Sequence, residues 1–193
     1  MSPVSFADVL EFWFGTPHSA ERGRPRRTWF KKSPAFDAQV RDHFLGTWEL
    51  AARDGLARWA ATPLAALARV IVLDQFPRNI FRGSARAFAA DPLALAAAKA
   101  MVGNGFDRLL RPVERLFVYL PFEHSEDAAA QGCSLELFEA LRAEPLGHDN
   151  TEYARRHFDI IARFGRFPHR NAILGRESTP EELKFLQQPD SSF

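Results

Sequence analysis

Residues 62–83 read TPLAALARVIVLDQFPRNIFRG and contain a helix start signal, a long apolar run and a polar cluster that follows it. Thr62 is a suitable N-cap, and Pro63 suits the first helical position, where its missing N–H is not needed. The apolar residues that follow predict a helix over Leu64–Phe76. Pro77 removes a backbone donor and disfavours helical geometry at the residue before it, so we expect the helix to stop there.

Similar start signals recur along the chain and predict further helices. Ser33-Pro34 and Asp91-Pro92 repeat the same start signal, with Ser33 as the N-cap, and Thr179-Pro180-Glu181-Glu182 has the pattern of a capping box. The predicted helices cover residues 6–14 (after Ser5), 34 to about 55, 64–76, 93–102, 113–120 (before Pro121), 125 to about 142 (capped by Ser125), 151–164 and 180–186. No segment alternates convincingly as a strand. We therefore expect an all-α protein of about eight short antiparallel helices, arranged as stacked helix pairs or as an irregular bundle.

Length and composition agree with one globular domain over residues 1–193. A chain of 193 residues buries roughly 70% of the surface that it exposes when unfolded, which is enough for a core without disulfides. The net charge is +1 and the basic residues are spread along the chain, so we expect no nucleic-acid partner. The sequence shows neither a signal peptide nor roughly 18 uninterrupted apolar residues, which predicts a cytoplasmic protein that does not bind membranes. The oligomeric state stays open.

The first cluster of polar residues lies at the predicted end of the helix over 64–76. Asp74 faces the unfavourable, negative end of the helix dipole unless a cation neutralises it, and Arg78 is the candidate cation. One interpretation is an ion pair accompanied by an Asn79 cap. The other is an anion-binding site in which Asp74 orients Arg78 and Arg82.

A second cluster follows Pro121. Capping a helix explains residues 125–127, whereas it leaves Glu123 and His124 unexplained. A carboxylate beside an imidazole can orient a general base or supply metal ligands. The spacing fits a metal site only loosely, and no cofactor motif is present, so we predict neither a metal nor a cofactor. His157 lies on the apolar stripe of its helix and is interpreted as a core histidine.

A third cluster follows the helix over 151–164. It contains His169, Arg170, Asn171 and Arg176, which could form a solvated basic loop. The neighbouring Phe167-Pro168 and Ile173-Leu174 should hold the segment against the core and give these side chains defined positions. Polar groups held in this way are better candidates for a site than mobile ones.

Four motifs, in this order, resemble a known bacterial family. They are VLEFWFG (residues 9–15), LDQFPRN (73–79), PFEHSE (121–126) and GRFPHRN (165–171), the last with REST (176–179). The chain resembles the family called domain of unknown function 924, and the resemblance spans nearly its whole length. It implies a tetratricopeptide-like helical fold and supplies no established reaction.

Our leading hypothesis is a pocket where the three polar clusters meet. It would bind a small anionic molecule through Arg78 and Arg170, with Arg82 or Arg176. His124 with Glu123, or His169, would act as acid or base, most plausibly in hydrolysis. One alternative is a non-enzymatic module that binds a protein partner along a helical face. Another is that the polar groups bond one another and lock the helix packing.

Overall fold

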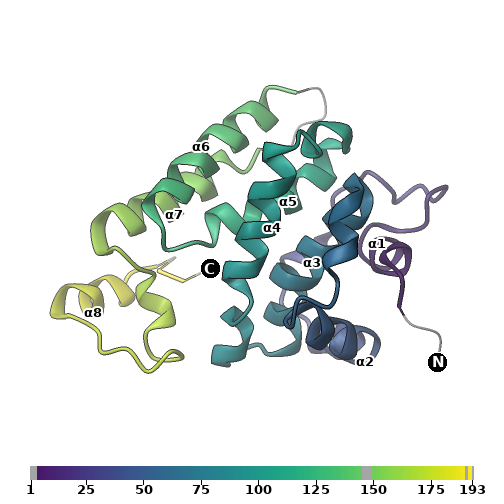
Figure 1. The fold of residues 1–193 in the computed structure, drawn as a ribbon. Helices are drawn as coiled ribbons and strands as arrows, with labels where there is room; N and C mark the ends of the chain where they lie inside the picture. The colour runs from purple at the N-terminus through teal and green to yellow at the C-terminus, as the bar shows by residue number, and fades with distance from the viewer. Residues whose placement is uncertain (1–3, 145–148, 190, 193) are drawn as a thin grey trace.

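The structure, a computed structural model, describes residues 4–144, 149–189 and 191–192, and these contain eight α-helices and no strand (Figure 1). The all-α prediction is therefore confirmed for the described residues. The helices are α1 (Phe6–Phe14), α2 (Pro34–Ala51), α3 (Pro63–Ile80), α4 (Asp91–Gly103), α5 (Pro112–Glu123), α6 (Ala128–Arg142), α7 (Thr151–Phe164) and α8 (Pro180–Leu186). α2 ends ahead of Gly55, where we expected its end, and short 3-10 helices occupy several of the connections.

Local capping interactions set several of the helix starts. Ser5 and Thr179 each form a capping box, in which the side chain of the cap accepts from a backbone N–H three residues later and the acidic side chain there returns a bond. Ser33 accepts from a backbone N–H in the same manner. The side chain of Thr62 makes no capping hydrogen bond, and α3 begins at Pro63 without it.

Two prolines that we expected to end helices lie inside them. α3 continues through Pro77 to Ile80, and α5 continues through Pro121. A proline inside a helix costs about 3 kcal/mol. In α3 the added turn buries Ile80 completely, and burial of such a side chain stabilises by about 1.5–3 kcal/mol, which offsets that cost together with the burial of Pro77. The prediction of a break at each proline was wrong because tertiary burial outweighs the local penalty.

The core is built around α3. It packs against α1, α2, α4 and α5. α6 packs against α5 and α7. Figure 1 shows α1–α3 on one side of the α4–α5 pair and α6–α7 on the other. Aromatic rings fill the space at α3, where Trp13 contacts Phe76 at 5.7 Å and Phe117 at 5.5 Å between centroids, both edge to face. The tetratricopeptide-like arrangement and the single domain remain predictions.

A smaller apolar cluster anchors the segment that follows α7. α7 ends at Gly165, whose φ of 69° is in the left-handed region that glycine adopts without a Cβ penalty. The chain then turns back, so that Phe167 is fully buried and packs with Ile160 and Ile161. This anchor confirms the expected contact of Phe167 with the core. The same expectation for Ile173 and Leu174 is wrong, because these side chains are 37% and 36% exposed. Within the described residues, no helix combines the length and apolarity needed to cross a membrane.

Candidate functional site

The structure brings side chains of all three polar clusters together. His124 Nδ1 lies 2.8 Å from Asp74 Oδ1, and Asp91 binds both Arg78 and Arg170. These contacts join the end of α3, the start of α4, the end of α5 and the segment after α7. We call the assembly the corner cluster, and it comprises Asp74, Arg78, Asp91, Glu123, His124, Glu126, His157, His169, Arg170 and Arg176.

Asp74 is the central carboxylate of the corner cluster. It is fully buried and accepts from Gln75 at 2.6 Å and from His124, while Arg78 lies 3.3 Å away. Burial alone would raise the pKa of Asp74, but Arg78 and His124 outweigh it and lower the pKa to about 2. Asp74 is therefore ionised at every pH at which the protein is expected to function.

The ionised Asp74 determines the tautomer of His124. Burial and the nearby Arg78 lower the pKa of His124 below its ordinary value, so the ring is neutral at neutral pH. A neutral imidazole next to a carboxylate carries its proton on the nitrogen that faces that carboxylate. Nδ1 thus donates to Asp74, and Nε2 becomes the acceptor. The side chain of His124 is 16% exposed, so the cluster extends to the protein surface.

Arg170 is held in the cluster with few hydrogen bonds. Its guanidinium stacks on Phe88 and Phe167, with centroid distances of 4.6 and 4.5 Å, and contacts Asp91 at 3.4 Å. Asp91 is already engaged by Arg78 through two bonds of 3.0 and 3.2 Å. Burial and the charge of Arg78 lower the pKa of Arg170 to about 10. Arg170 remains a cation, and its buried Nε has no hydrogen-bond partner within the described part of the chain.

Glu123 and His157 form a second, more deeply buried pair. Glu123 Oε1 lies 3.5 Å from His157 Nδ1, which also contacts the carbonyl oxygen of Tyr153 at 2.8 Å. Burial and the charge of Asp74 raise the pKa of Glu123 to about 8, and burial lowers the pKa of His157 to about 3. Both side chains are therefore neutral at pH 7. His157 is buried, as expected, but it also belongs to the corner cluster.

Glu126 connects the second polar cluster to the third. It accepts from the backbone N–H of Phe167 at 2.8 Å and binds Arg176 through bonds of 2.7 and 2.9 Å. The assignment of residues 125–127 to capping is confirmed for Asp127, which caps α6, and is wrong for Ser125 and Glu126. The carboxylate of Glu126 instead fixes the segment that carries His169, whose pKa burial lowers to about 4.

We expect Glu126→Gln to lower the free energy of unfolding by about 1–2 kcal/mol, because the two charge-assisted bonds to Arg176 are lost. Urea denaturation at pH 7 measures the change. Glu139→Gln is the control, because Glu139 pairs with Arg142 on the exposed surface of α6 and should change the free energy by less than about 0.5 kcal/mol. Equal changes in the two variants would contradict the role given to Glu126.

Three of the candidate ligand-binding residues have their principal contacts outside the corner cluster. Asn79 and Arg82 both bind Asp37 at the start of α2, with donor–acceptor distances of 2.7–2.8 Å. The amide of Asn171 donates to Ser178 at 3.0 Å. These interactions indicate structural roles for the three side chains.

Sequence reasoning missed three members of the corner cluster. Asp91 was interpreted as part of a helix start, Glu126 as a capping residue and His157 as a core residue. Each of these residues has a sufficient local explanation, so nothing in the sequence indicates that it belongs to a site.

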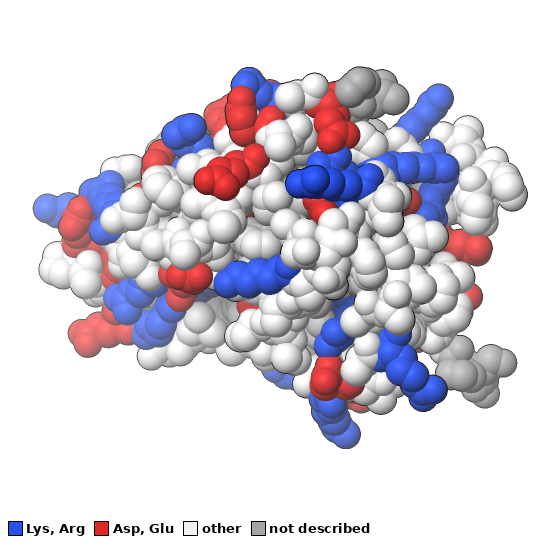
Figure 2. Space-filling model, turned by 45° about the horizontal axis from the view of Figure 1, so that its top comes forward, with Lys and Arg blue, Asp and Glu red and all other residues white. Residues whose placement is uncertain are grey.

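The protein surface carries charges of both signs. Acidic and basic side chains are interspersed on the face shown in Figure 2. Two hollows, of about 550 and 700 Å³, are lined by residues other than those of the cluster. Access to the cluster depends instead on partly exposed side chains, namely those of Arg78 (20%), Asp91 (17%) and Arg176 (23%). Among the described residues, no group of three or more potential ligands has a metal-binding arrangement.

The fold and the cluster define an all-α protein in which buried acidic, basic and histidine side chains meet at the ends of several helices. Its family is the one described as bacterial protein of unknown function, DUF924, whose sequence profile matches residues 9–190, and the chain belongs to it. A similar solved structure is that of ATU0120, a protein of unknown function from Agrobacterium tumefaciens. The two are 42% identical, with a TM-score of 0.83 over 94% of this chain and 96% of that one. A comparison with curated proteins finds no match.

Proposed function

We propose that the corner cluster binds a small anionic molecule, a carboxylate or a phosphate, and that His124 acts as the general base in its hydrolysis. The observation that carries the proposal is Arg170. Its guanidinium is buried between two aromatic rings and retains donors that Asp91 does not use. Buried donors without partners are costly, and an anion at this position would satisfy them.

The Asp74–His124 pair supports the catalytic part of the proposal. Asp74 fixes the ring so that Nε2 can accept a proton from water. The hydroxyl then bonds to the acyl carbon or phosphorus, the bond to the leaving group breaks, and the proton on Nε2 passes to the leaving group. Arg170 would neutralise the charge that develops on the substrate. Glu123 is too deeply buried to meet a ligand directly. We place the base at His124 and not at His169, because Asp74 holds the ring of His124 through a hydrogen bond.

Binding and hydrolysis are tested with separate variants. Arg170→Met keeps most of the side-chain volume without the charge and should weaken binding of succinate or inorganic phosphate roughly 10- to 100-fold. His124→Gln should retain binding but slow hydrolysis of mono-4-nitrophenyl glutarate or 4-nitrophenyl phosphate by roughly 10²–10⁴-fold. Thermal shift and calorimetry measure binding, and release of nitrophenolate measures hydrolysis.

Arg86→Met is the matched control, because Arg86 stacks on Trp48 and Phe81 away from the cluster. It should leave binding and hydrolysis unchanged. Circular dichroism establishes that each variant is folded. If folded Arg170→Met and Arg86→Met bind the probes equally, or if the unsubstituted protein binds none of them, the proposal fails and the packing-lock hypothesis is favoured. The protein-interaction module remains the second hypothesis from the sequence.

A further inference from the structure

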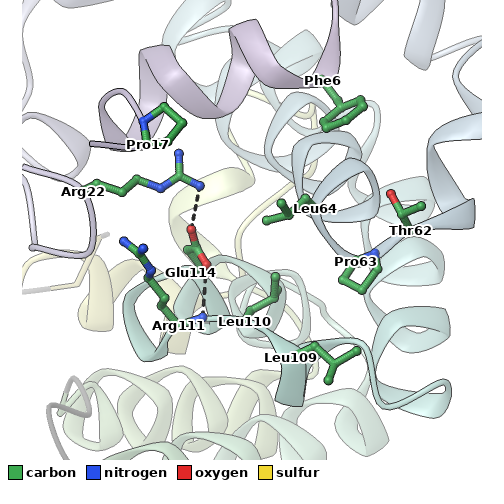
Figure 3. A pocket seen from close by; sticks show the side chains of 10 residues that line it. All are labelled: Phe6, Pro17, Arg22, Thr62, Pro63, Leu64, Leu109, Leu110, Arg111 and Glu114. Carbon is green, nitrogen blue, oxygen red and sulfur yellow. Dashed lines mark hydrogen bonds and ion pairs between the residues drawn. The ribbon is translucent and has the colours of Figure 1, made fainter. Parts of the chain in front are cut away.

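A separate hollow of about 550 Å³ lies between the start of α1, the start of α3 and the start of α5 (Figure 3). Its volume is within the range of about 300–1,000 Å³ that is usual for small-molecule sites. None of its lining residues belongs to the corner cluster, so what it binds is independent of the proposed function.

One side of this hollow is apolar. Phe6, Leu64 and Leu109 line it, and these large side chains are 37%, 42% and 74% exposed. They come from α1, from the first turn of α3 and from the segment before α5. Apolar side chains that gather around a concave surface, instead of lying singly, are typical of a binding site.

The other side of the hollow is charged. Glu114 accepts from Arg22 at 2.8 Å and from the backbone N–H of Arg111 at 3.1 Å, so both of its carboxylate oxygens are used. The second guanidinium nitrogen of Arg22 donates to the carbonyl oxygen of Gly15 at 3.2 Å. Arg22 and Glu114 therefore neutralise each other within the protein. Glu114 is buried and Arg22 is partly buried, with 4% and 9% of their side chains exposed.

Arg111 provides the remaining charge. Its guanidinium lies beside Arg22 and Glu114, across the hollow from Phe6 and Leu109 (Figure 3). Two guanidinium groups and one carboxylate leave one net positive charge at this end. The two bonds to Glu114 come from Arg22 and from the backbone of Arg111, so the guanidinium donors of Arg111 are available to a ligand.

We propose that this hollow binds a small aliphatic monocarboxylate. The carboxylate pairs with Arg111, and the alkyl body covers Phe6, Leu64 and Leu109. A cation at one end and apolar side chains at the other match the two halves of such a molecule. A carboxylate without an alkyl body, or an alkyl chain without a carboxylate, satisfies only one end.

Isothermal titration with octanoate, below its micellar concentration, tests this site. Octanoate should bind at least roughly tenfold more tightly than acetate or 1-octanol, because each of these lacks one of its two contacts. Arg111→Met should weaken octanoate binding by roughly tenfold or more and leave that of 1-octanol unchanged. Leu64→Ser should weaken both. Arg108→Met, which removes a neighbouring exposed charge outside the lining, is the matched control and should change neither.

Two results would overturn the inference. In the first, octanoate binds no more tightly than acetate. In the second, Arg111→Met and Arg108→Met affect octanoate equally. Arg170→Met separates this site from the corner cluster, because it should not change octanoate binding here. If octanoate binding survives Arg111→Met but is lost in Arg170→Met, the carboxylate binds at the corner cluster, which contradicts the second site and supports the first.

Discussion

Asp74→Ala is expected to lower the free energy of unfolding by about 3–5 kcal/mol, the usual cost of removing one partner of a buried ion pair. Asp74 is fully buried, and its carboxylate binds His124, Gln75 and Arg78. Without it, the charge of Arg78 and the donor of His124 lose a buried partner. Urea denaturation at pH 7, followed by circular dichroism, measures the change.

Glu181→Ala is the control for this substitution. Glu181 also binds an arginine, Arg163, at 2.7 Å, but both side chains are exposed, at 62% and 51%. Exposed pairs of this kind contribute about 0–1 kcal/mol. If Asp74→Ala costs no more than Glu181→Ala, then solvent compensates for the missing carboxylate and the corner cluster is not a desolvated site.

Glu123→Gln is expected to stabilise the protein at high pH. The pKa of Glu123 rises from 4.5 to about 8 on folding. Below pH 4.5 the carboxyl group is protonated in both states, whereas between pH 4.5 and 8 it ionises only in the unfolded state. Stability is therefore lost as the pH rises through this interval. Glutamine cannot ionise, so the variant should be more stable than the unsubstituted protein by about 2–4 kcal/mol at pH 8 and equally stable at pH 4.

The measurement is urea denaturation at pH 4, 6 and 8, expressed as the difference between variant and unsubstituted protein. The difference is the informative quantity, because the low pKa values of His157 and His169 reduce the stability of both proteins below pH 6.5. Glu139→Gln again serves as the exposed control and should show no such trend. A difference that does not change with pH would mean that folding leaves the pKa of Glu123 at its ordinary value, which would contradict the desolvation of this carboxyl group.

The sequence predicted helix starts well where the interactions are local. Ser5, Ser33 and Thr179 were identified as caps because each one bonds a residue three positions along the chain. The helix ends at Pro77 and Pro121 were predicted wrongly, because the burial that outweighs a proline involves residues far away in the sequence. Rules based on neighbouring residues predict the free-energy cost of the proline, but they do not include the stabilisation that comes from burial against residues distant in sequence.

The same distinction applies to the candidate site. Arg170 and His124 were identified because they follow predicted helix ends and have no capping role, and Asp74 because it lies at the unfavourable end of a helix dipole. Asp91, Glu126 and His157 were missed because each had an adequate local explanation. A residue was identified when its local sequence context left its charge or polarity unexplained, and it was missed when that context explained it. The local context contains no information about which residues lie next to it in the folded protein.

By itself, the sequence determined that the chain is helical, where most helices begin and which polar residues lie near helix ends, because caps and turns act over three or four residues. Only the tertiary structure decided that α3 continues through Pro77 and that Asp74 meets His124, 50 residues away. It also decided that Asn79 and Arg82 turn to Asp37 instead. Such contacts depend on how helices pack, and packing is set by the summed burial of many distant side chains.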